Sequence, residues 1–103
     1  MAQDDGEMML TVLLRHDQSK PLAELIRLQR EQGLFKKLPP EGVTLVSWHV
    51  LMGLGHAVTL RLPASRLREV NLAIEGAAWG PFRTEIYATY DLKDTVTRLR
   101  AES

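Results

Sequence analysis

Three histidines are the residues of this 103-residue chain best suited to moving a proton. His16 and His49 lie near the ends of two apolar stretches, and His56 directly follows the glycine-rich stretch Met52–Gly55. The ordinary pKa of histidine, about 6.5, lets the side chain accept and release a proton near neutral pH. We therefore take His56, His49 and His16, in this order, as candidate catalytic residues. The alternative for each is the commoner role of a histidine at a strand end, a solvated or interface residue.

Aromatic and basic side chains accompany these histidines and could hold a small planar or acidic molecule. The alternative for the two tryptophans is an anchor in the core or in an interface. The candidate ligand-binding residues are Trp48, Trp79, Arg83, Tyr87 and Tyr90.

A metal site would require all three imidazoles to converge at about 2.0–2.1 Å from one ion. Side chains alternate between the two faces of a strand, so His49 could point away from the other two. We expect neither a metal nor another cofactor.

The apolar spacing predicts four strands, two long helices and a short third helix. Ser19, Ser65 and Asp94 are expected to cap the three helices. The expected elements are a strand over Met8–His16, a helix from Pro21 to about Gln32, strands over Val43–Met52 and His56–Leu62, a helix after Ser65 to about Ala78, a strand over Thr84–Tyr90 and a short helix from Asp94 to Leu99.

The first helix has one stripe at helical spacing that we expect to be buried. Leu34 and Phe35 should close the end of that core. The stripe consists of Leu22, Leu25, Ile26 and Gln29.

The order β-α-β-β-α-β predicts an α+β, ferredoxin-like domain, with two helices on one face of an antiparallel sheet. Right-handed crossovers give the strand order 4-1-3-2. The strands read as apolar on both faces, so we expect a second copy to cover the face without helices, as a homodimer or higher even oligomer. We assign 1–7 to a flexible N-terminus, 8–92 to the domain and 93–103 to a C-terminal extension.

Composition excludes several classes of protein. Thirteen basic and 13 acidic residues give a net charge of zero, so no general attraction to nucleic acid or to an anionic membrane is expected. The chain has no cysteine, which excludes disulfides and thiolate chemistry. The acidic N-terminus and the lack of a long apolar run predict a cytoplasmic protein.

The stretch Gly53–Pro63, followed at once by a capped helix, resembles the centre of the dimeric α/β-barrel proteins. The muconolactone isomerases are similar through Leu28–Glu31, through Gly55-His56 and through the aromatic-proline segment Trp79–Phe82. The glycine-tyrosine-aspartate (GYD) domain proteins are also similar, but they have a tyrosine and an acid where this chain has Gly55 and His56. No catalytic residue of the isomerases matches a position of this chain.

This resemblance implies a ferredoxin-like domain that pairs sheet to sheet as a dimeric α/β barrel. It favours a small cofactor-independent enzyme, isomerase-like or monooxygenase-like, acting on an aromatic-derived metabolite. The alternatives are a non-catalytic module that binds a small molecule and a structural oligomeric protein, because a fold does not by itself imply a function.

Overall fold

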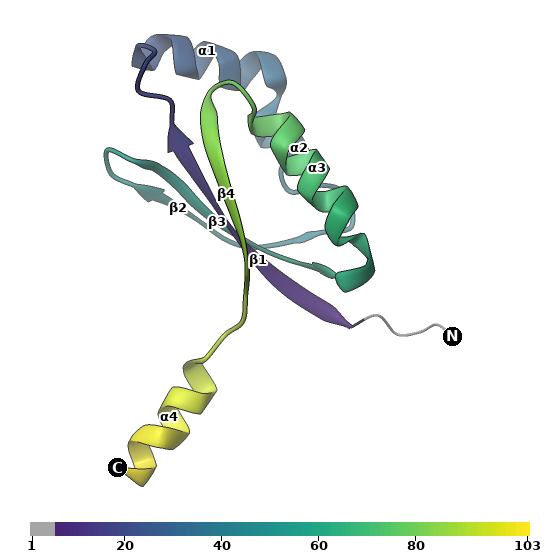
Figure 1. Ribbon diagram of the computed structural model, residues 1–103, viewed down its shortest axis with the longest axis vertical. Coiled ribbons are helices and arrows are strands. Elements are labelled where there is room, and N and C mark those ends of the chain that lie inside the picture. Colours follow the sequence, from purple (N-terminus) through teal and green to yellow (C-terminus); the bar gives the residue numbers. More distant parts are fainter. Residues whose placement is uncertain (1–5) are drawn as a thin grey trace.

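The computed structural model describes residues 6–103, and its main strands and helices follow the predicted order (Figure 1). Two short elements, α2 and a 3₁₀ turn over Ala64–Arg66, were not predicted. The elements are β1 Glu7–His16, α1 Leu22–Gln32, α2 Leu34–Lys37, β2 Thr44–Leu51, β3 Gly55–Pro63, α3 Leu67–Ala78, β4 Phe82–Thr89 and α4 Lys93–Glu102.

The four strands form one antiparallel sheet in the order β2-β3-β1-β4. Read from β4, this is the order 4-1-3-2, so the α+β class and the strand order are confirmed. At the centre of the sheet, Val12 of β1 lies opposite Val58 of β3 and Ile86 of β4. The arrangement is consistent with a ferredoxin-like fold.

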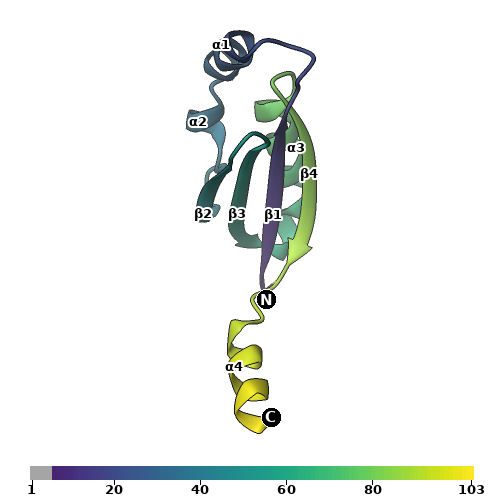
Figure 2. The ribbon, with the colours of Figure 1, turned by 90° about the vertical axis from the view of Figure 1, so that its left-hand side faces the viewer.

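The two faces of the sheet have different surroundings. On the face that we call the helix face, α3 lies behind β1 and β4 (Figure 2). Alternate residues of β1 and β3 point to this face and are buried with the apolar residues of α3. The buried core includes Leu10, Val12, Leu14, Val58, Leu60, Leu62, Val70 and Ile74.

The opposite face of the sheet, the open face, is covered by no helix in the described part of the chain (Figure 2). It is more polar than we predicted. Thr11 lies at its centre, and its hydroxyl contacts those of Thr59 at 3.4 Å and Thr89 at 3.1 Å. Apolar Met9 and Leu13 flank this row of hydroxyls on β1 and are only partly buried.

Helix α1 does not lie flat on the sheet, which corrects the predicted buried stripe. It lies beyond the ends of the strands (Figures 1 and 2). Leu25 and Gln29 are buried, whereas Leu22 and Ile26 are 62% and 43% exposed, because the sheet does not extend beneath them. Phe35 is likewise 61% exposed.

The predicted caps also differ from those observed. Ser19 donates from its amide and hydroxyl to the carboxylate of Asp17, and Pro21 occupies the N-cap of α1. Arg66 and Leu92 hold the corresponding positions of α3 and α4.

The chain ends fit the predicted bounds only in part. The flexible tail predicted over 1–7 falls outside the described residues up to position 5, and β1 already begins at Glu7. Helix α4 extends away from the rest of the domain in both views (Figures 1 and 2). No helix of residues 6–103 is both long and apolar enough to cross a bilayer.

The turn between β2 and β3 contains two glycines with positive φ angles. Gly53 has a φ of 79° and Gly55 a φ of 149°, values that side chains disfavour. A Cβ atom on Gly55 would also lie 1.8 Å from the carbonyl oxygen of Leu14. Gly55 therefore allows β3 to begin in close contact with the end of β1.

Candidate functional site

His16 and His56 lie side by side on the helix face, at the end of the sheet where β1 ends. His56 pairs with Leu14 across β1 and β3, which places it diagonally beside His16. The two imidazole rings meet edge to face, with centroids 5.9 Å apart. Phe82, the residue opposite His16 on β4, stacks on His16 at 5.6 Å and meets His56 edge-on at 5.5 Å.

A hydrogen bond from Trp48 orients the imidazole of His56. The indole Nε1–H donates to His56 Nδ1 over 2.9 Å. Because an indole nitrogen is only a donor, Nδ1 of His56 must be the acceptor, and the proton of the neutral ring lies on Nε2. The tautomer follows from the chemistry of tryptophan.

The surroundings of His56 also keep it uncharged. Burial, and then the charge of neighbouring His16, lower the pKa of His56 below its ordinary value of 6.5. A second proton would sit on Nδ1 and face the Trp48 N–H, donor against donor. His56 is thus a neutral hydrogen-bond donor through Nε2 at neutral pH.

Three predicted site residues lie away from the histidine pair. His49 pairs with Ala57 and Ala57 with Leu13, so His49 lies on the open face. Tyr87 lies opposite Thr11 on the open face, where its hydroxyl donates to Glu85. Tyr90 follows β4 and is 82% exposed.

On the open face, Glu85 binds two partners. Arg15 Nε lies 2.5 Å from one of its oxygens, and Tyr87 donates to the other over 3.0 Å. The Tyr87 bond and then the Arg15 bond lower the pKa of Glu85, and the same carboxylate raises the pKa of Tyr87. Tyr87 therefore belongs to an ionic network on the face opposite the histidines.

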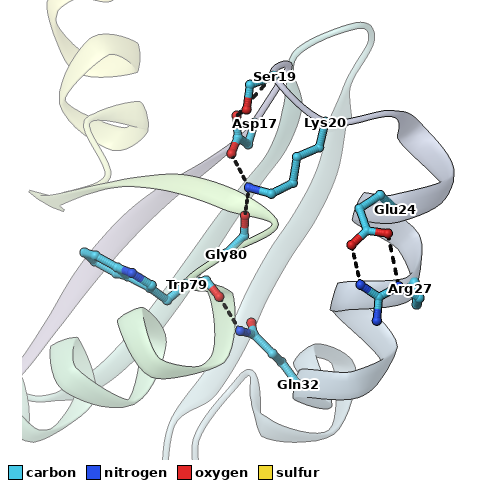
Figure 3. Close-up of polar contacts among 8 residues, drawn as sticks. All are labelled: Asp17, Ser19, Lys20, Glu24, Arg27, Gln32, Trp79 and Gly80. Atoms are coloured by element: carbon cyan, nitrogen blue, oxygen red, sulfur yellow. Dashed lines mark hydrogen bonds and ion pairs between the residues drawn. The ribbon is translucent and has the colours of Figure 1, made fainter.

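The loops after β1 and before β4 enclose a groove of about 440 Å³, lined by Lys20, Trp79, Phe82 and Arg83 among others. Lys20 Nζ binds Asp17 at 2.6 Å and lies 3.5 Å from the carbonyl oxygen of Gly80 (Figure 3). The Lys20 bond, followed by that of Ser19, holds the pKa of Asp17 well below its usual range. Lys20 is therefore already neutralised by a carboxylate.

Trp79 and Arg83 are the groove residues with free binding capacity. The carbonyl of Trp79 is held by the side chain of Gln32, while its indole ring points away from this contact (Figure 3) and Trp79 is 66% exposed. Arg83 forms no salt bridge with any residue in the 6–103 range, and it lies opposite Arg15 across β1 and β4, on the open face. A planar anion could stack on the indole and pair with the guanidinium.

A second hollow, of about 340 Å³, adjoins the first and contains His16. Arg83 and Asp17 line both hollows. Because Arg83 lies on the open face and His16 on the helix face, a molecule held by Arg83 would approach His16 around the end of the strands, where both residues line this hollow.

Sequence reasoning missed Phe82, Asp17 and Lys20. Phe82 was placed in a loop because the last strand was expected to begin at Thr84. Continuing the alternation of β4 back by two residues from Thr84 would have put Phe82 on the same face as Thr84 and Ile86. No group of three or more metal-ligating side chains occurs within the described residues.

No family model matches the chain, and no curated protein matches it. Among solved structures, the chain is similar to a REP-associated tyrosine transposase bound to a REP hairpin, with a TM-score of 0.41 and 20% sequence identity. The similarity covers 95% of this chain and 64% of the transposase chain. A similarity at this level assigns neither a fold nor a function.

Proposed function

We propose that the chain is the subunit of a small cofactor-independent enzyme that moves a proton within a planar, aromatic-derived carboxylic acid. The observation that carries the proposal is the position of Arg83, which lines both the groove of Trp79 and the hollow of His16. An anion recognised by Arg83 is thereby brought near an imidazole.

Each residue has a distinct role in this proposal. Arg83 would pair with the carboxylate, and Trp79 would stack on the planar part of the substrate. His16 would take a proton from one carbon and return it to another, as an isomerase requires. No oxidant or reductant enters such a step, because one proton leaves the substrate and one proton returns to it, so its oxidation state does not change.

His56 would act as a positioning residue. Its burial, the larger cause of its lowered pKa, keeps it neutral, and its tautomer is set by Trp48. A neutral neighbour leaves His16 free to become an imidazolium during proton transfer.

We also propose that a second copy of the chain covers the open face of the sheet. Helix α3 lies on the other face, and Met9 and Leu13 remain partly exposed beside the row of threonines. Hydroxyls that already bind one another, as Thr11 and Thr89 do, lose less on leaving water than unpaired hydroxyls would.

The ligand is the first point to test. Aromatic carboxylates and unsaturated lactone acids would be added to the protein while its thermal stability is recorded. Binding should raise the melting temperature as RT ln(1 + [L]/Kd). Arg83→Gln should abolish the shift, whereas Arg68→Gln, which removes an exposed arginine on α3, should retain it.

Proton transfer is tested separately in D₂O. The enzyme should exchange a carbon-bound hydrogen of the bound acid for deuterium, and His16→Gln should lose exchange while still binding. Binding without exchange in the wild-type protein would support the alternative, a non-catalytic small-molecule module. If no acid binds, both the enzyme and the small-molecule module are contradicted, and a structural role is left.

A further inference from the structure

Two arginines lie directly opposite each other on neighbouring strands of the open face. Arg15 of β1 pairs with Arg83 of β4, one residue before β1 ends at His16. Like charges that face each other across two strands repel and lower the stability of a sheet. This pair therefore costs the ligand-free protein stability unless another charge offsets it.

The carboxylates around the two arginines already have partners. One oxygen of Glu85 lies 2.5 Å from Arg15 Nε, and the other accepts a hydrogen bond from the Tyr87 hydroxyl at 3.0 Å. Asp17 is bound by Lys20 at 2.6 Å (Figure 3). The carboxylate of Glu85 is thus the nearest compensation for two guanidinium groups.

Both arginines keep hydrogen-bond donors that no other described residue binds. Arg15 uses Nε for Glu85, so the N–H groups of its terminal amino groups remain available. The guanidinium of Arg83 forms neither a hydrogen bond nor a salt bridge within residues 6–103. These donors can bind an acidic ligand.

The two side chains reach the same hollow. Arg15 and Arg83 both line the space of about 340 Å³ that contains His16. Of the two, only Arg83 also lines the groove of Trp79. Because the hollow lies at the strand ends, a ligand can enter it from there even when a second copy covers the centre of the open face. The groove offers an aromatic surface, and the adjoining hollow offers two guanidinium groups.

Two acidic groups fit this hollow better than one. An arginine binds a carboxylate through two parallel N–H···O bonds, so one carboxylate on Arg83 would leave the donors of Arg15 to water. During the proposed proton transfer, Arg15, Arg83 and the imidazolium of His16 carry three positive charges. Glu85 and two ligand carboxylates carry three negative charges, which balance them.

We propose that Arg15 sets the specificity of the site and that the ligand is a planar dicarboxylic acid. Arg83 binds one carboxylate, the terminal amino groups of Arg15 bind the other, and the planar part extends toward Trp79. Glu85 holds Arg15 in place through Nε. The inference rests on the proposed function, from which it takes the acid-binding role of Arg83, and it narrows the substrate class.

Binding of matched acids tests the number of acidic groups. Dissociation constants would be measured by calorimetry near neutral pH for benzoate, for phthalate, isophthalate and terephthalate, and for inorganic phosphate. The three dicarboxylates differ in the spacing of their carboxylates. At least one of them should bind about 10-fold more tightly than benzoate, because it gains one more charge-assisted pair.

Arginine variants locate the second carboxylate. Arg15→Gln should bind the preferred dicarboxylate no more tightly than benzoate, and Arg83→Gln should bind neither. Arg15→Lys keeps a positive charge beside Glu85 but lacks the fork of donors, so it should also lose most of the preference. Arg61→Gln is the matched control and should preserve the preference, because Arg61 pairs with Met9 on the open face and does not line the hollow.

The outcomes separate this inference from the proposed function. Equal binding of benzoate and every dicarboxylate would overturn the role of Arg15, while Arg83-dependent binding of benzoate would still support the proposed acid site. A full dicarboxylate preference in Arg15→Gln would overturn it as well. A preference that Arg15→Gln removes, without deuterium exchange in the wild-type complex, would uphold the dicarboxylic acid and contradict the enzyme.

Two further outcomes would contradict both proposals. One is tight binding of phosphate that needs both arginines while every carboxylate binds more weakly, which would identify a single doubly charged group as the ligand. The other is that no acid binds.

The ligand-free protein gives a measurement that needs no ligand. Arg83→Gln removes the charge opposite Arg15 and breaks no salt bridge between residues 6 and 103, so the melting temperature should stay the same or rise by a few degrees. A clear decrease would show that Arg83 stabilises the fold and would overturn its assignment to a ligand.

Discussion

Trp48 Nε1 donates a hydrogen bond to His56 Nδ1 over 2.9 Å, and this contact joins β2 to the start of β3. It sets the tautomer of His56 and opposes its protonation, since an imidazolium would present a second donor to the indole. One tryptophan thus determines the chemical state of one histidine of the candidate site.

Replacing the indole donor should change both stability and titration. Trp48→Phe leaves His56 Nδ1 without its partner, so we expect a loss of about 1 kcal/mol in the free energy of unfolding, plus the lost packing. The pKa of His56 should rise, because the opposing donor is gone. Urea unfolding and NMR titration of the imidazole C–H signals measure the two effects.

Trp79→Phe is the matched control, because the Trp79 ring is largely exposed. It should leave the titration of His56 unchanged. If Trp48→Phe also leaves it unchanged, the hydrogen bond does not govern the protonation of His56.

Stability should fall as the pH is lowered through the titration of His56. The pKa of His56 in the folded protein lies below its ordinary value of 6.5, first because of burial and then because of His16. Between these two pKa values the unfolded chain binds more protons, so this contribution is fully present above pH 6.5 and is lost toward the folded pKa. Melting temperatures from pH 8 to pH 5 should decrease by a few degrees.

His56→Gln should flatten this pH dependence, since glutamine can accept from Trp48 and does not titrate. His49→Gln changes a histidine on the open face and should preserve it. If the melting temperature falls equally steeply with pH in the wild-type protein and in His56→Gln, other groups cause the acid sensitivity.

The glycine turn should tolerate no side chain at Gly55. Gly55→Ala places a Cβ 1.8 Å from the carbonyl of Leu14 at a φ of 149°, so we expect a loss of more than about 2 kcal/mol. Gly76→Ala is the contrast, because the added methyl on α3 meets no atom within 4 Å. It should stabilise the protein by about 0.5–1 kcal/mol. Chemical unfolding gives the change in the free energy of unfolding for both variants. A mild loss in Gly55→Ala would contradict the close approach of Gly55 to the carbonyl of Leu14.

The open face can be tested with one charge. Leu13→Lys puts an ammonium beside Thr11 on the face that a second copy would cover, so it should shift the oligomer toward monomer. Met52→Lys adds the same charge at the tip of the β2–β3 turn, where the side chain is 95% exposed, and should leave the mass unchanged. Light scattering over a range of concentrations measures the mass of each variant. A stable dimer in Leu13→Lys would argue against pairing through the open face.

Local patterns were sufficient for the elements and for the strand order. The alternation of Leu10, Val12 and Leu14 identifies the helix face of β1 without any tertiary information, since successive side chains point to opposite faces. The glycines of the β2–β3 turn and Gly33 at the end of α1 mark positive φ angles, a property of the backbone at single residues. The strand order follows from the handedness of the crossovers.

Tertiary structure decided the contacts between residues distant in the sequence. Whether Leu22 and Ile26 of α1 are buried depends on how far the sheet extends beneath the helix, which helical spacing does not contain. The pairing of His16 with Phe82 depends on the register between β1 and β4, residues 66 positions apart. His49 lies on the open face and His56 on the helix face because register and pleat assign each side chain to one side of the sheet. The chain by itself therefore determined which side chains could do chemistry, while only the packing of strands and helices decided which of them meet.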